Sequence, residues 1–192
     1  TVTAVVTNAF GTASKTFDVH VFEWNWGNTM SYVVTDSVES SVGTGGNSFS
    51  WGAMFPAAFM NDRNYMSYVD FYAGYAGNYT VTLYQGGDNA PATKIYERSV
   101  SVTSAERGWY RVHMLEPVSI DQTKNLWVTF TSSGVQYPAT YGPYCGDDNG
   151  SWVGMGGQWT DIYTASQGQI MGTWLIRATT SDTPLAINGA ED

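Results

Sequence analysis

Side chains that could do chemistry are concentrated in residues 141–163, YGPYCGDDNGSWVGMGGQWTDIY, where acidic and amide groups lie among aromatic rings and glycines. Glycine-rich loops allow a ligand to approach the backbone closely. Indole rings can stack on the apolar faces of sugars, while carboxylates and amides hydrogen-bond to hydroxyl groups. The segment therefore predicts a glycan-binding site, and its candidate ligand-binding residues are Trp152, Trp159, Tyr163, Asp147, Asp148, Asn149 and Asp161.

Two other interpretations of this segment stay open. Trp152 and Trp159 could be core residues of short strands, with DDNG as a turn that tolerates positive φ. Asp147 and Asp148 could also supply hard oxygen ligands for calcium, together with a facing loop. The segment lacks the regular ligand spacing and the terminal Glu of a helix-loop-helix calcium site, so no cofactor is expected beyond this possible calcium ion.

Catalytic signatures are sparse. The sequence contains neither G-x-S-x-G nor H-E-x-x-H. His20 and His113 lie in strand-like runs, and the only cysteine, Cys145, has acidic neighbours that would raise the pKa of its thiol. The sequence therefore predicts that the chain is not an enzyme. A Cys145–His113 dyad, or a pair of carboxylates for glycoside hydrolysis, stays an open alternative.

Composition and charge argue against some classes of binding partner. The chain has 192 residues, 43% hydrophobic content and a net charge of −9, which argues against nucleic acid as a partner. No apolar run reaches the roughly 18 to 20 residues that span a bilayer, so membrane insertion is not expected. The sequence starts without an initiator Met or a leader, from which we expect an export signal that was removed or lies upstream.

Alternating apolar and polar residues, separated by turn residues every 8 to 15 positions, predict an all-β antiparallel jelly-roll sandwich. The clearest example is Tyr79–Gln85, which should bury Tyr79, Val81 and Leu83 and end at Gly86-Gly87. One helical turn is expected, within 56–63. The other strands are expected at 30–35, 48–55, 65–72, 93–102, 109–114, 125–132, 137–144, 151–155 and 171–179.

The N-terminal residues read as a separate hairpin, with strands at 2–7 and 15–22 and Gly11 at the turn. A two-stranded ribbon is marginal in water. We therefore expect residues 1–22 to dock through Trp24 and Trp26 or to self-associate. The predicted division is a hairpin at 1–23, a jelly-roll domain at 24–180, and a polar tail or linker at 181–192.

The segment VTAVVTNAFGTASKTFDVHV resembles the last two strands of PKD or immunoglobulin-like modules. The segments SFSWGAMFPAAF, NYTVTLYQGGDNAP, NLWVTFTSSGVQYPA, CGDDNGSW and WLIRA resemble adhesin-like jelly-roll accessory domains of secreted Bacteroides-type proteins. This resemblance implies a secreted or cell-surface location and a binding role.

Together these features predict a non-catalytic extracellular module for adhesion or carbohydrate binding, recognising a glycan or surface protein as part of a larger secreted protein. A structural spacer that supports a neighbouring catalytic domain is the main alternative, and a small hydrolase is the third. The sequence leaves ligand identity, strand order and oligomeric state undetermined.

Overall fold

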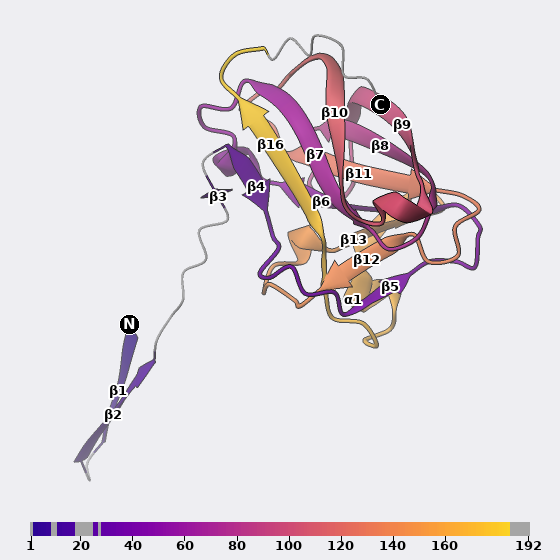
Figure 1. Ribbon diagram of the computed structural model, residues 1–192. Coiled ribbons are helices and arrows are strands. Elements are labelled where there is room, and N and C mark those ends of the chain that lie inside the picture. Colours follow the sequence, from indigo (N-terminus) through magenta and orange to yellow (C-terminus); the bar gives the residue numbers. More distant parts are fainter. Residues whose placement is uncertain (1, 9–10, 18–24, 27, 185–192) are drawn as a thin grey trace.

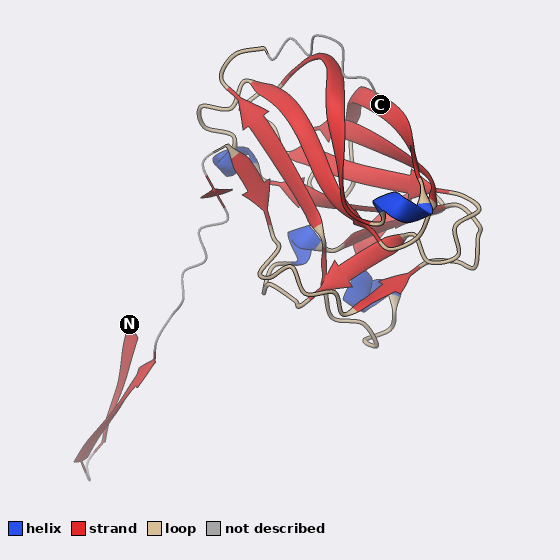
Figure 2. Ribbon diagram, in the orientation of Figure 1, coloured by secondary structure: helices blue, strands red, loops and turns tan. Residues whose placement is uncertain are grey.

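The computed structural model describes residues 2–8, 11–17, 25–26 and 28–184. Almost every regular element in these ranges is a strand (Figure 2). The strands are β1 (Val2–Asn8), β2 (Gly11–Phe17), β3 (Asn25–Trp26), β4 (Thr29–Ser31), β5 (Ser40–Val42), β6 (Phe49–Phe55), β7 (Tyr65–Ala73), β8 (Gly77–Gln85), β9 (Thr93–Val102), β10 (Gly108–Ser119), β11 (Leu126–Ser132), β12 (Ala139–Gly142), β13 (Trp152–Met155), β14 (Gln158–Asp161), β15 (Thr173–Trp174) and β16 (Ile176–Ser181).

The strands from β3 onward form two layers. One is a six-stranded sheet in the order β14-β13-β6-β11-β8-β9, and the other contains a five-stranded sheet in the order β10-β7-β16-β4-β3. A small sheet, β15-β12-β5, extends this second layer, because the backbone of Leu175 hydrogen-bonds to both Thr140 of β12 and Tyr72 of β7. All recorded pairings are antiparallel.

The chain repeatedly crosses between the layers, as Figure 1 shows for β6, β7 and β8. Such crossings are typical of a jelly roll. Aromatic rings join the layers at the centre, where the Phe71 ring of β7 lies 4.5 Å from the Phe130 ring of β11. Trp51 of β6 stacks on Phe130 at 5.6 Å. The prediction of an all-β antiparallel sandwich is therefore confirmed.

The predicted core face of β8 is confirmed. Tyr79, Val81 and Leu83 are buried between the layers, and the strand ends before Gly86 and Gly87, which both adopt positive φ. Gly87 needs this freedom because a Cβ there would lie 1.9 Å from the carbonyl oxygen of Ala90. Every second side chain of the strand therefore points into the core.

The N-terminal hairpin is a two-stranded sheet of its own and lies apart from the sandwich in Figure 1. Its connection is shorter than predicted, because Gly11 is not in the turn but pairs with Asn8 as the first residue of β2. Short connections are the commonest in hairpins. Val2 lies opposite Phe17, whereas His20 and Trp24 are outside the described residues, as is part of the predicted tail.

Other boundaries differ from the predictions where local pattern is weak. The predicted strand 30–35 is the shorter β4, and 171–179 is broken at Leu175 into β15 and β16. The strands β5 and β14 were not predicted, since both are short and adjoin a glycine, Gly43 after β5 and Gly157 before β14. Helical segments among the described residues are brief: η1 (Ala57–Phe59), η2 (Ser104–Glu106), η3 (Asp148–Gly150) and α1 (Ile162–Ala165).

Within the described part of the chain, no helix has the length and apolar character that crossing a membrane would require.

Candidate functional site

A pocket of about 270 Å³ opens where the segment after β12 meets β14, α1 and the approach to β15. This volume is close to the lower end of the range for small-molecule sites, about 300 Å³ upward. Its walls combine carboxylates, hydroxyls and aromatic rings. The lining residues are Tyr144, Asp148, Ser151, Asp161, Ile162, Tyr163, Thr164, Met171 and Gly172.

Two short helical segments shape the pocket, and an aspartate begins each of them. The Asp147 side chain accepts a hydrogen bond from the backbone N–H of Asn149 (2.9 Å) at η3, and Asp161 accepts one from Thr164 (2.8 Å) at α1. Aspartate is favoured at this position because it accepts from backbone donors that have no partner within the helix. Ile162 N–H donates to the carbonyl oxygen of Ser151 (2.9 Å), which ties the two segments together.

One wall of the pocket contains a tyrosine paired with a carboxylate. The Tyr144 hydroxyl donates to Asp148 Oδ1 at 2.8 Å. Burial, followed by this hydrogen bond to Asp148, raises the pKa of Tyr144 to about 12. The phenol is therefore neutral at pH 7, with its proton directed to Asp148. The pair offers acceptor oxygens to a ligand hydroxyl.

Asp161 provides a second carboxylate. Burial alone would raise the pKa of Asp161, but hydrogen bonds from Thr164 outweigh it and lower the pKa below its usual value. Asp161 therefore stays charged at neutral pH. The rim is apolar and accessible, since Tyr163 is 51% exposed and Met171 is 55% exposed. A pocket lined by carboxylates and an exposed ring is suited to a small polyol.

Three of the predicted binding residues, Asp148, Asp161 and Tyr163, line the pocket. Asp147 and Asn149 contribute to its frame through the cap of η3 and are not among its lining residues. The two predicted tryptophans are also absent from the lining. They lie on the outer side of the six-stranded sheet, where Trp152 pairs in register with Asp161.

The tryptophans pack against the sheet. Trp152 and Trp159 are partly buried and lie 5.1 and 5.8 Å from the fully buried ring of Trp127. Trp159 rests on Gly154, where an added Cβ would lie 2.8 Å from the indole. Among the tryptophans that the structure describes, Trp51, Trp127 and Trp174 are fully buried, whereas Trp152 and Trp159 are only partly buried.

Calcium binding by Asp147 and Asp148 remains a prediction. Among the residues that the structure describes, no group of three or more His, Cys, Asp or Glu side chains is close enough to hold a metal ion. The Asp147 side chain is already engaged by Asn149, and Asp148 by Tyr144.

Several lining residues were not among the predicted binding residues. Ser151 lies within the segment 141–163, and Thr164, Met171 and Gly172 follow that segment. Gly172 carried a usable signal, because a glycine inside a predicted strand, here 171–179, often marks close packing. Here an added Cβ would lie 2.3 Å from the Tyr141 ring.

Cys145 adjoins the pocket segment without the surroundings of a nucleophile. Burial raises the pKa of its thiol. The sulfur hydrogen-bonds to the Asp147 carbonyl oxygen at 3.3 Å, while the Cys145 backbone N–H donates to Thr173. His113 lies in β10, where its ring contacts Tyr68 at 5.9 Å. A reactive cysteine needs a lowered pKa, which this environment does not provide.

No protein-family model and no curated protein matches the chain. Solved structures of the protein Cwp84 are among those that share its fold. One is the clostridial cysteine protease Cwp84 after propeptide cleavage, with a TM-score of 0.59 and 17% identity over 80% of this chain and 41% of that chain. The other comprises the cysteine protease and lectin-like domains of Cwp84, a surface layer associated protein of Clostridium difficile. Its TM-score is 0.52, with 18% identity over 70% of this chain and 33% of that chain. The chain therefore spans less than half of either protein, and the likeness concerns the fold.

Proposed function

We propose that this chain is a non-catalytic binding module of a secreted or cell-surface protein and that its pocket recognises one sugar unit of a surface glycan. The observation that carries the proposal is the convergence of Tyr144, Asp148, Asp161 and Tyr163 around one open pocket. Sugar hydroxyls both donate and accept hydrogen bonds, so they match charged carboxylates beside a neutral phenol. The exposed Tyr163 ring offers a surface for the apolar face of the sugar.

Two further points support a binding role. One structural neighbour comprises the cysteine protease and lectin-like domains of a surface layer associated protein. Burial and the acidic neighbour Asp147 both raise the pKa of the Cys145 thiol, which supports a module without a thiol nucleophile. The relation to adhesin-like accessory domains, with the hairpin as the end of an immunoglobulin-like module that can self-associate, is part of the same proposal.

A glycan array probed with the chain tests the proposal, followed by titration of the best binder against Tyr163→Ala and Tyr144→Phe. The control is Tyr137→Ala, because Tyr137 is a comparably exposed tyrosine (38%) that packs against Tyr75. We expect each pocket variant to lose about 1 to 3 kcal/mol of binding free energy, with little change in melting temperature. The control should bind like the unmodified chain.

Each alternative has its own outcome. An array without any retained glycan would refute the proposal and favour the structural spacer. Equal losses in Tyr137→Ala and Tyr163→Ala would show that the pocket is not the binding site. Release of free sugar from the bound glycan would contradict the absence of catalysis.

A further inference from the structure

The outer face of the five-stranded sheet carries a second concentration of aromatic and charged side chains. Directly opposed residues of an antiparallel sheet point to the same side. Pairing places Arg111 of β10, Asp70 of β7 and Arg177 of β16 in one row across the sheet. Trp109 and Tyr72 form the next row toward one end. On the other side, His113 and Tyr68 form a row that continues to Thr179.

The two arginines are held in place by rings and carboxylates. The Arg111 guanidinium lies over the Tyr68 ring (3.7 Å to the centroid) and donates to both oxygens of Asp70, at 2.7 and 2.9 Å. The Arg177 guanidinium lies over Trp109 at 4.0 Å and donates to Asp36. Stacking fixes these long side chains before a ligand arrives, which lowers the entropy lost on binding.

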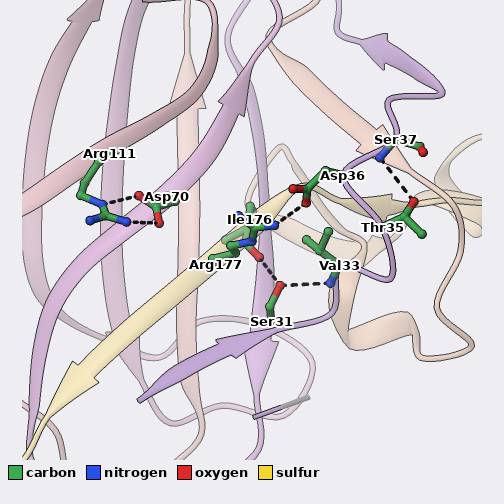
Figure 3. Close-up of polar contacts among 9 residues, drawn as sticks. All are labelled: Ser31, Val33, Thr35, Asp36, Ser37, Asp70, Arg111, Ile176 and Arg177. Atoms are coloured by element: carbon green, nitrogen blue, oxygen red, sulfur yellow. Dashed lines mark hydrogen bonds and ion pairs between the residues drawn. The ribbon is translucent and has the colours of Figure 1, made fainter. Parts of the chain in front are cut away.

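Asp36 comes from the loop after β4, which reaches the row of charged residues beside Arg177 (Figure 3). The loop is anchored by Ser31, whose Oγ donates to the Ile176 carbonyl (3.0 Å) and accepts from the backbone N–H of Val33 (3.1 Å). Beyond Asp36, the N–H of Ser37 donates to Thr35 Oγ1 at 3.3 Å. The anchored loop that carries Asp36 therefore borders the outer face beside Arg177.

Charge balance identifies the kind of ligand. Each guanidinium has its own carboxylate, so the row presents donors next to acceptors without a surplus of either sign. The chain as a whole has a net charge of −9, which disfavours an acidic ligand. Paired donors and acceptors match adjacent sugar hydroxyls, and the partly exposed rings beside them suit the apolar faces of sugars.

One partner of each ion pair stays accessible to a ligand. The side chains of Arg111 and Asp36 are 47% and 61% exposed, whereas those of Asp70 and Arg177 are 13% and 28% exposed. An exposed ion pair contributes only about 0 to 1 kcal/mol to stability, although a bidentate pair such as Arg111–Asp70 contributes more. From Trp109 to His113 the rows span about 13 Å along the strand. This is long enough to contact more than one ring of an extended chain.

We propose that this sheet face, centred on Arg111, Asp70, Arg177 and Asp36, is a second binding surface that takes a neutral glycan chain independently of the pocket. It would contact several sugar units through paired guanidinium and carboxylate groups, whereas the pocket would hold one.

The test uses four neutral tetrasaccharides, built from glucose with α links, glucose with β links, mannose and N-acetylglucosamine, together with acidic tetragalacturonate. Each is titrated into the chain, and nuclear magnetic resonance follows the Trp109 indole N–H and the arginine Nε–H signals. Affinity is then compared for Arg177→Met, Asp36→Asn and Tyr163→Ala. The matched control is Arg107→Met, an exposed arginine whose Nε donates to the Ser104 carbonyl.

We expect at least one neutral tetrasaccharide to shift the Trp109 and Arg177 signals. Its affinity should fall about 10-fold or more in Arg177→Met and Asp36→Asn, and remain within about 2-fold in Arg107→Met. Circular dichroism and melting temperature verify that each variant is folded.

Shifts confined to residues around Tyr163 would overturn this proposal and leave the pocket as the binding site. Shifts confined to the sheet face, with Tyr163→Ala unchanged, would support this proposal and refute the pocket. Binding of tetragalacturonate alone would overturn the assignment of a neutral ligand. If no saccharide shifts any signal, both proposed binding sites would be refuted.

Discussion

Replacing Gly172 with alanine should strain the wall between the pocket and the small sheet. An added Cβ would lie 2.3 Å from Cδ2 of the Tyr141 ring, whereas ordinary contacts start at 3.4 Å, so the ring must move by about 1 Å. Tyr141 packs edge-on against Trp174 (6.3 Å), which is 1% exposed and cannot easily give way. Overpacking of this kind costs about 1 to 3 kcal/mol.

Urea unfolding followed by tryptophan fluorescence measures this cost directly. A loss of that size corresponds to a fall of about 2 to 12 °C in melting temperature for a chain of this length. In a Tyr141→Ala background the obstructing ring is absent, and Gly172→Ala should then cost less than about 0.5 kcal/mol. Such non-additivity is expected for two residues in contact.

A control separates crowding from backbone strain. Gly156 has a φ of +59° and nothing within 4 Å of its Cβ position. Gly156→Ala should therefore cost about 1 kcal/mol through its left-handed backbone alone, and equally in both backgrounds. An equal cost of Gly172→Ala with and without the Tyr141 ring would refute the steric argument.

Three further predictions concern single sites. Cys145→Ser should keep any glycan binding, and the unmodified thiol should react slowly with iodoacetamide at pH 7 because burial raises its pKa; rapid alkylation would contradict this. The pKa of Asp121 is lowered to about 2, chiefly by a hydrogen bond from Thr123. Its stabilising effect should be complete above about pH 4 and disappear as the pH falls through 2. The stability difference between the chain and Asp121→Asn should therefore shrink over that interval, and a constant difference would count against the assignment. Gly154→Ala should displace the Trp159 ring, because the added Cβ would lie 2.8 Å from it, and should shift tryptophan emission to longer wavelength without weakening pocket binding; loss of pocket binding would show that Trp159 supports the site.

The sequence determined the elements whose signal is local. Alternation over 79–85 and the glycines that follow specified β8, its buried face and its end. The strand 93–102 was predicted with its observed bounds. These features follow from the period of two along a strand and from the φ values that glycine alone adopts freely, so they need no knowledge of distant residues.

The sequence also located one region of the pocket and three of its lining residues. Asp148, Asp161 and Tyr163 belong to the segment richest in polar and aromatic residues, so composition identified them. Composition also selected Trp152 and Trp159, which pack on the six-stranded sheet instead. Residue type alone does not distinguish a ring that packs on a glycine from one that lines a pocket.

The tertiary structure alone decided which distant residues meet. Arg111 and Asp70 are 41 positions apart, and Arg177 and Asp36 are 141 apart, yet each pair is in contact on one sheet face. Their meeting depends on strand order and on pairing register. A shift of one residue would turn every side chain of a strand to the opposite face. Register is set by the packing of the whole sandwich, so no local pattern in the sequence could place the two arginines on either side of Asp70.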